Sequence, residues 1–196
     1  MKDKIAEIVY REIESNLRDK DFILLAIDGR CGSGKTTLAG RLQEICRGKA
    51  LSCEIVHMDH FYPRLEQRTA ERLNEAGGNL DRERFLDEVM KPLKRREAFS
   101  YRPYDPRVHQ MAEAIHIGLS EVIIIEGSYS CHPALYDNYD LRIFLTVDEP
   151  ERLRRIRERN GEEGLLQFQE KWIPMEESSF SAYRIEERCE LHFKTG

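Results

Sequence analysis

The chain has 196 residues, of which 40% are hydrophobic and 34% are charged, and its formal net charge is −5. This length fits one domain with its own core, and the composition is too apolar for a disordered chain. The negative charge provides no overall basic field for a nucleic-acid backbone or an anionic membrane, so we expect neither as a partner.

The first segment predicts an amphipathic helix over residues 4–18, because apolar residues recur there near helical spacing. It shows neither the apolar stretch nor the cleavage site of a secretory leader. The longest strongly apolar run, residues 22–27, is far shorter than the roughly 20 residues that cross a bilayer. The five cysteines include no CxxC pair, which argues against a disulfide framework or a zinc site. We therefore expect a cytoplasmic protein.

The apolar run at 22–27 predicts a strand buried in a parallel sheet, and residues 36–46 return to helical character. Between them the chain matches the phosphate-loop (P-loop) motif G-x-x-x-x-G-K-[ST]. In such a loop, backbone N–H groups converge on phosphate oxygens at a helix N-terminus. The alternative is an incidental glycine-rich turn. The residues expected to bind ATP are Gly29, Arg30, Cys31, Gly32, Ser33, Gly34, Lys35, Thr36 and Thr37.

Three side chains of this loop have expected chemical roles. Lys35 should reach the β- and γ-phosphates, and the Thr36 hydroxyl should ligate Mg²⁺. Cys31 lies where helix N–H groups can lower a thiol pKa, so we predict a reactive thiol.

Residues 52–58 predict a second buried strand, which ends at Asp59. A carboxylate there would face the γ-phosphate from the acceptor side and could accept the proton of an attacking hydroxyl. An ordinary turn or helix-capping aspartate is the open alternative. Residues 63–82 and 99–110 predict irregular surface segments, inside an acceptor-binding insertion that we expect over about 60–118.

Residues 122–125 predict a further strand, followed at once by Glu126. A carboxylate at this position could hold Mg²⁺ or its water shell, although a glutamate that merely starts a loop is also common. Residues 141–147 predict another buried strand, and residues 191–193 a last short one.

Two helices are predicted over residues 150–160 and 165–187, on either side of a glycine-containing segment. Arg152, Arg155 and Arg159 fall at i, i+3 and i+7 on one helical face, and such a row could close over a triphosphate. A solvated helix held by i,i+4 ion pairs is the alternative. We expect a lid over about 150–175, with Arg155 and Arg159 as catalytic residues.

Residues 22–193 resemble the uridine kinase and phosphoribulokinase family of P-loop kinases, whose motifs follow in the same order. The family motif D-x-F-Y is similar to residues 59–62, and N-[WF]-D-H-P-D-x-F to residues 79–85. The Y-D-x-x-x-H segment of uridine kinases keeps its spacing at 104–109. E-G is found at 126–127, and the family's lid helix R-L-x-R-x-x-x-R-D resembles residues 152–160.

The resemblance implies roles for residues on the acceptor side. It makes Asp59 the catalytic aspartate, with Tyr62 of the same segment also facing the acceptor. It makes Asp81 the ribose-binding aspartate, and it places Tyr104 and His109 in the base pocket. On composition alone, Tyr104 and His109 fit an ordinary surface hairpin equally well.

We therefore expect one P-loop kinase domain over residues 1–196. Its fold should be α/β with a doubly wound parallel sheet, the P-loop nucleoside triphosphate hydrolase fold with a helical lid. The expected reaction transfers the γ-phosphate of ATP, with Mg²⁺, to the 5′-hydroxyl of a nucleoside of the uridine or cytidine type.

Two alternatives remain. One is a kinase of the same fold for a sugar phosphate, glycerate or pantothenate. The other is a nucleotide-dependent regulatory protein, which is disfavoured because the chain has no guanine-reading N-K-x-D motif. The oligomeric state is open, a homo-oligomer included.

Overall fold

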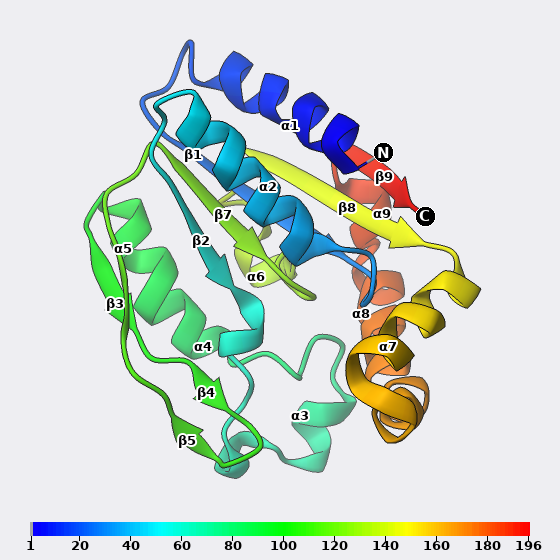
Figure 1. The fold of residues 1–196 in the computed structure, drawn as a ribbon. Helices are drawn as coiled ribbons and strands as arrows, with labels where there is room; N and C mark the ends of the chain where they lie inside the picture. The colour runs from blue at the N-terminus through cyan, green and yellow to red at the C-terminus, as the bar shows by residue number, and fades with distance from the viewer. Residues whose placement is uncertain (1) are drawn as a thin grey trace.

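The computed structural model describes residues 2–196. At its centre is a five-stranded sheet with the strand order β2-β7-β1-β8-β9 (Figure 1). Every neighbouring pair of strands in this sheet is parallel. The expected α/β fold with a parallel sheet is therefore confirmed. The strands are β1 (Ile23–Gly29), β2 (Cys53–His57), β7 (Val122–Glu126), β8 (Leu141–Val147) and β9 (Leu191–Thr195).

Helices cover both faces of the sheet, which explains why its central strands are apolar throughout (Figure 1). On one face lie α1 (Lys2–Asn16) and α2 (Lys35–Gly48). Val9, Ile13 and Leu42 of these helices are fully buried in the core that they share with β1, β7 and β8. Both helices were predicted from apolar spacing.

The segment between β2 and β7 contributes a large part of the second core, on the opposite face. Phe85, Val89 and Leu93 are buried there, on a helix that runs from Arg82 to Lys94. This helix is not among the predicted elements, although its apolar residues recur every four positions. Its parts are α4 (Arg82–Phe85), the π-helical η3 (Leu86–Met90) and α5 (Lys91–Lys94).

The prediction of irregular structure over 63–82 and 99–110 is wrong for the residues that form short elements. A helical turn and a short helix lie in the first segment, and two antiparallel strand pairs, β3 with β6 and β4 with β5, involve the second. These elements are η2 (Leu65–Gln67), α3 (Ala70–Asn74), β3 (Phe99–Tyr101), β4 (Tyr104–Asp105), β5 (Gln110–Met111) and β6 (Ile115–Ile117). A further helical turn, η1 (Met58–His60), follows β2 directly.

The C-terminal third is mainly helical, as predicted. The expected break at 160–164 is a kink inside one helix, α7 (Glu149–Gln167), where Gly161 has φ 72° and ψ −177°. A left-handed φ of this kind suits glycine because it has no Cβ. The remaining helices are α6 (Pro133–Tyr136), η4 (Phe168–Trp172), α8 (Ile173–Tyr183) and α9 (Ile185–Arg188). Within residues 2–196, no helix combines the length and apolar character needed to cross a membrane.

Candidate active site

The P-loop connects β1 to α2. Gly34 caps α2 with φ 93°, a left-handed conformation that favours glycine, and the helix begins at Lys35. The first N–H groups of a helix lack partners within it, so they are available to an anion. The Lys35 ammonium donates hydrogen bonds to the carbonyls of Gly29 (2.5 Å) and Arg30 (3.1 Å), which holds it over the loop.

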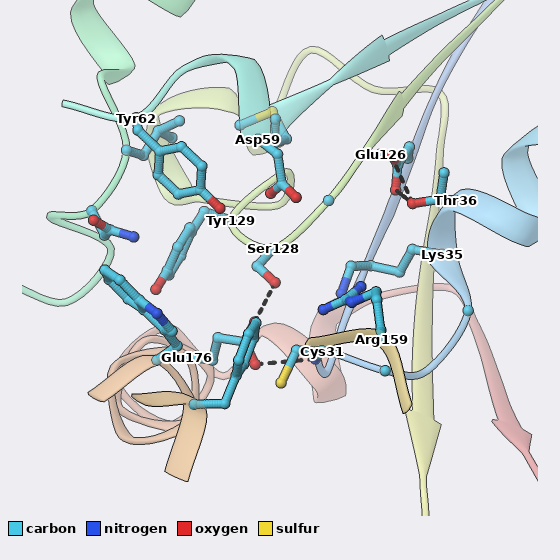
Figure 2. A pocket seen from close by; sticks show the side chains of 18 of the residues that line it. Cys31, Lys35, Thr36, Asp59, Tyr62, Glu126, Ser128, Tyr129, Arg159 and Glu176 are labelled. Atoms are coloured by element: carbon cyan, nitrogen blue, oxygen red, sulfur yellow. Dashed lines mark hydrogen bonds between the residues drawn. The ribbon is translucent and has the colours of Figure 1, made fainter. Parts of the chain in front are cut away.

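A cavity of about 300 Å³ opens beside this loop (Figure 2). Its walls come from the P-loop, from the ends of β2 and β7, and from the lid helices. Residues expected on the donor side and residues expected on the acceptor side therefore share one space. The predicted residues that line it are Cys31, Gly32, Gly34, Lys35, Thr36, Thr37, Asp59, Tyr62, Glu126, Arg155 and Arg159.

Thr36 and Glu126 form a pair of oxygen ligands at the end of the sheet. The Thr36 hydroxyl lies 3.2 Å from each carboxylate oxygen of Glu126. His57, which faces Glu126 across the β2–β7 register, has its Nδ1 2.5 Å from Glu126 Oε1. The hydrogen bond to Glu126 raises the pKa of His57. A hydroxyl next to a carboxylate is the hard oxygen donor set that Mg²⁺ prefers, so these residues fit that ion.

Asp59 follows β2 in the short helical turn η1, and its carboxylate is open to the cavity (Figure 2). Desolvation by the surrounding protein raises the pKa of the Asp59 carboxyl, while the positive charge of Lys35 opposes the rise. Tyr62 lies beside it, with its hydroxyl turned toward the Asp59 carboxylate (Figure 2). Burial and the neighbouring Asp59 charge hold the pKa of Tyr62 well above its ordinary value.

Three predicted acceptor residues lie outside the cavity lining. Asp81 is 1% exposed and caps α4 by accepting the N–H of Arg84 at 3.2 Å. Tyr104 and His109 lie on the β4–β5 hairpin, with the phenol oxygen and Nδ1 3.4 Å apart. Their proposed roles toward ribose and base stay predictions. Two neighbours of Asp81, Asn79 and Leu80, do line the cavity.

Gly29, Arg30 and Ser33 belong to the P-loop without lining the cavity. The Arg30 side chain is directed to the C-terminal helices, where its guanidinium pairs with Glu177 (2.9 Å) and Glu186 (3.0 Å). The contribution of these three residues to nucleotide binding stays a prediction.

The arginine row predicted for the lid divides into two parts. Arg152 is 5% exposed and is bonded to Glu176 (3.0 Å) and Glu177 (2.9 Å), so it belongs to the base of the lid. Arg155 and Arg159 line the cavity. The expectation that Arg152 lies over the triphosphate is therefore wrong. The helix that carries the three arginines is present.

The prediction of a reactive Cys31 is also wrong. Burial of its thiol, followed by the nearby Glu176 charge, raises the pKa of Cys31 to about 12. Glu176 accepts the backbone N–H of Cys31 at 3.1 Å, so a carboxylate lies close to this thiol. The prediction of a lowered thiol pKa rested on the helix N–H groups and did not include this negative charge. The thiol is thus protonated at neutral pH.

Several cavity residues were not identified from the sequence. Ser128 and Tyr129 follow Glu126 at the same edge of the sheet, and that position is a signal that could have found them. Trp172 ends η4, inside the expected lid, and Glu176 lies on α8 just after it, where no motif distinguishes them from neighbouring charged and apolar residues.

A P-loop between β1 and α2, with a carboxylate at the end of the neighbouring strand, defines a P-loop nucleotide-binding domain of the kinase type. A model of the AAA domain family matches residues 25–177, and the chain belongs to that family.

Sequence relatives of the chain are named uridine kinases. The uridine kinase of Ureaplasma parvum serovar 3 (strain ATCC 27815 / 27 / NCTC 11736) is 28% identical over 176 residues, which cover 81% of this chain and 82% of that protein. The uridine kinase of Clostridium novyi (strain NT) is 27% identical over 140 residues, which cover 68% of this chain and 66% of that protein. These relatives support a P-loop kinase.

Solved structures share the fold. A protein described as a possible uridine kinase from Bacillus stearothermophilus superimposes with a TM-score of 0.73, at 20% identity, covering 97% of this chain and 99% of the other. The D-glycerate 3-kinase from Cryptococcus neoformans var. grubii gives a TM-score of 0.67 at 14% identity, covering 89% and 87%. At these identities the similarity shows the fold alone.

Proposed function

We propose that the protein transfers the γ-phosphate of ATP to a hydroxyl group of a small molecule, with a nucleoside of the uridine or cytidine type as first candidate. One observation carries this proposal. A single cavity holds Lys35 and the Thr36–Glu126 pair on one side and the Asp59 carboxylate on the other (Figure 2). A kinase needs this juxtaposition of phosphate-binding groups and a proton acceptor.

On the donor side, the P-loop N–H groups bind phosphate oxygens and Lys35 moves from the loop carbonyls to the β,γ-phosphates. Thr36 and Glu126 would hold magnesium, which when bound neutralises charge on the phosphates. Arg155 and Arg159, on the lid side of the cavity, stabilise the charge that develops on the transferring group.

On the acceptor side, Asp59 accepts the hydroxyl proton as the acceptor oxygen bonds to the γ-phosphorus and the bond to the β,γ-bridging oxygen breaks. The raised pKa of Asp59 makes it a better proton acceptor than an ordinary aspartate. Aromatic side chains of Tyr62, Tyr129 and Trp172 line the same cavity and offer faces for a planar base.

The names of the sequence relatives favour a nucleoside. The same fold in D-glycerate 3-kinase keeps a kinase of another small metabolite as second candidate. The cytoplasmic location and any homo-oligomer stay predictions from the sequence.

A test measures ADP formation by the purified protein with Mg·ATP and a panel of nucleosides and small hydroxyl compounds. We expect turnover that depends on the acceptor, and a loss of about 100-fold or more in Lys35→Ala, because the transition-state charge loses its cation. Lys49→Ala, at an exposed lysine just after α2, is the matched control. Near-normal turnover in Lys35→Ala would contradict the proposal, and slow hydrolysis indifferent to every acceptor would instead indicate a regulatory nucleotide-binding protein.

A further inference from the structure

One half of the cavity has a wall of polar oxygen atoms. Figure 2 shows Tyr62, Tyr129 and Glu176 together on the side opposite Thr36 and Lys35. We call this region the acceptor half; it consists of Asp59, Tyr62, Asn79, Ser128, Tyr129 and Glu176.

Two hydroxyl groups of the acceptor half face carboxylates. Ser128 Oγ donates to Glu176 Oε1 at 2.5 Å. The Tyr62 hydroxyl is turned toward the Asp59 carboxylate (Figure 2). A hydroxyl has one proton and two lone pairs, so both oxygens present lone pairs to the cavity. This wall therefore mainly accepts hydrogen bonds.

Glu176 is held in place by hydrogen bonds to both of its side-chain oxygens. Its second oxygen, Oε2, accepts the N–H of Cys31 (3.1 Å) and the guanidinium of Arg152 (3.0 Å), and the residue is only 5% exposed. Arg152 does not line the cavity, so it compensates the charge of Glu176 from behind. The carboxylate is thus oriented by the protein before a molecule binds.

Among the residues that the structure describes, the cations that line the cavity are Lys35 of the P-loop and Arg155 and Arg159 of the lid. Lys35 and Arg155 are bonded to the P-loop carbonyls of Gly29 and Gly32. The Arg159 guanidinium lies over the ring of Phe168, 5.6 Å from its centroid. A carboxylate or phosphate on the acceptor would therefore lose its water next to Asp59 and Glu176, while Lys35 and Arg155 are already bonded to the P-loop, which is unfavourable.

We propose that Glu176, together with the Ser128 hydroxyl that it orients, is a specificity-determining residue that selects acceptors with several hydrogen-bond donors and no negative charge. The proposal rests on the proposed function, since it takes the cavity as the acceptor site of a kinase. It excludes acids such as D-glycerate and pantothenate, and also pentose phosphates, although the fold alone would permit them.

The first measurement compares kcat/KM of the wild-type protein, at saturating Mg·ATP, for two sets of acceptors. Uridine, cytidine and an unphosphorylated sugar form the uncharged set, and D-glycerate, pantothenate and a pentose phosphate form the anionic set. We expect the best uncharged acceptor to exceed every anionic one by about 100-fold or more, as for a site built to pair with substrate donors. An anionic acceptor used as well as the best uncharged one would overturn the role of Glu176 while leaving the kinase intact. Absence of turnover with either set would overturn both proposals.

The second measurement uses Glu176→Gln, with Glu187→Gln on α9 as a control for loss of one exposed charge. A hydrogen bond to a charged group is worth enough that its loss should raise the acceptor KM by about 10-fold or more. We expect kcat within a few-fold, a rise in the acceptor KM several times larger than any rise in the ATP KM, and a smaller preference for uncharged acceptors. A purely structural role would instead shift the ATP KM and the acceptor KM together, and that result would overturn the proposal.

Ser128→Ala guards against misfolding of the first variant, because it removes only the hydroxyl. It should raise the acceptor KM in the same direction, by less than Glu176→Gln does. An unchanged acceptor KM in Ser128→Ala would show that the Ser128–Glu176 pair does not contact the acceptor.

Discussion

Asp59 is the residue on which the chemical step of the proposed reaction depends. It is proposed to bond the acceptor hydroxyl most strongly as the proton leaves, and an interaction made only in the transition state lowers kcat when it is lost. We expect Asp59→Asn to reduce kcat by about 100-fold or more, with a modest change in acceptor KM, as for a lost general base. Steady-state kinetics at saturating Mg·ATP would measure this split.

Asp87→Asn provides the control, since Asp87 is an exposed aspartate that pairs with Lys91 on the surface. A rise in acceptor KM with unchanged kcat in Asp59→Asn would mean that Asp59 binds the acceptor and that another group takes the proton.

At the scale of elements, the base of the lid is joined by ion pairs between α7 and α8. Arg152 on α7 is bonded to Glu176 and Glu177 on α8, and two of these three side chains are almost fully buried. Removing one partner of a buried pair leaves the other charge uncompensated, which typically costs about 3–5 kcal/mol. We expect Arg152→Ala to lower the free energy of unfolding by an amount of this order, measured by urea titration.

Arg154, two residues further along α7, is the matched comparison. It is 54% exposed and pairs with Glu151 and Glu158 at the surface. Exposed pairs of this kind contribute about 0–1 kcal/mol, so Arg154→Ala should be close to wild type. Equal losses in the two variants would show that the buried bonds of Arg152 do not hold the lid base.

The same comparison explains what the sequence can predict about elements. Arg152 and Arg155 share a helical face by spacing, but only the position of α8 determines that Arg152 is buried against Glu176. The central strands were predictable because parallel strands are continuously apolar. The helix at 82–94 could have been found from Phe85, Val89 and Leu93, whereas very short strands such as β4 and β5 lack a period long enough to detect.

At the scale of the whole molecule, the site depends on contacts between residues that are far apart in sequence. The P-loop was predictable because its residues are consecutive and their spacing carries the chemistry. The bond between Glu176 and the N–H of Cys31 joins residues 145 positions apart, and no local pattern reports it. Placement of the acceptor half therefore required the packing of α8 against the P-loop.

Asp28 connects this long-range packing to pH. It lies at the end of β1, is fully buried, and accepts the N–H groups of Gly29 (2.7 Å) and Cys131 (2.8 Å). Burial raises the pKa of Asp28 from 3.8 to about 6 in the folded protein. The folded state therefore holds this proton to a higher pH than the unfolded chain does, which favours folding at low pH.

The sign of the effect follows from that difference. The contribution of Asp28 is fully present below about pH 4 and is lost as the pH rises through about 6. A difference of about two pH units corresponds to about 3 kcal/mol, to an order of magnitude. We expect the free energy of unfolding of Asp28→Asn, minus that of the wild type, to increase by up to this amount between pH 4 and pH 7.

Urea titrations at steps of half a pH unit would measure this difference. Asp137→Asn, on the surface after α6, would show how much the remaining groups contribute. A difference between wild type and Asp28→Asn that stays constant across this range would mean that the carboxyl of Asp28 is ionised throughout, with its charge stabilised by the two N–H groups.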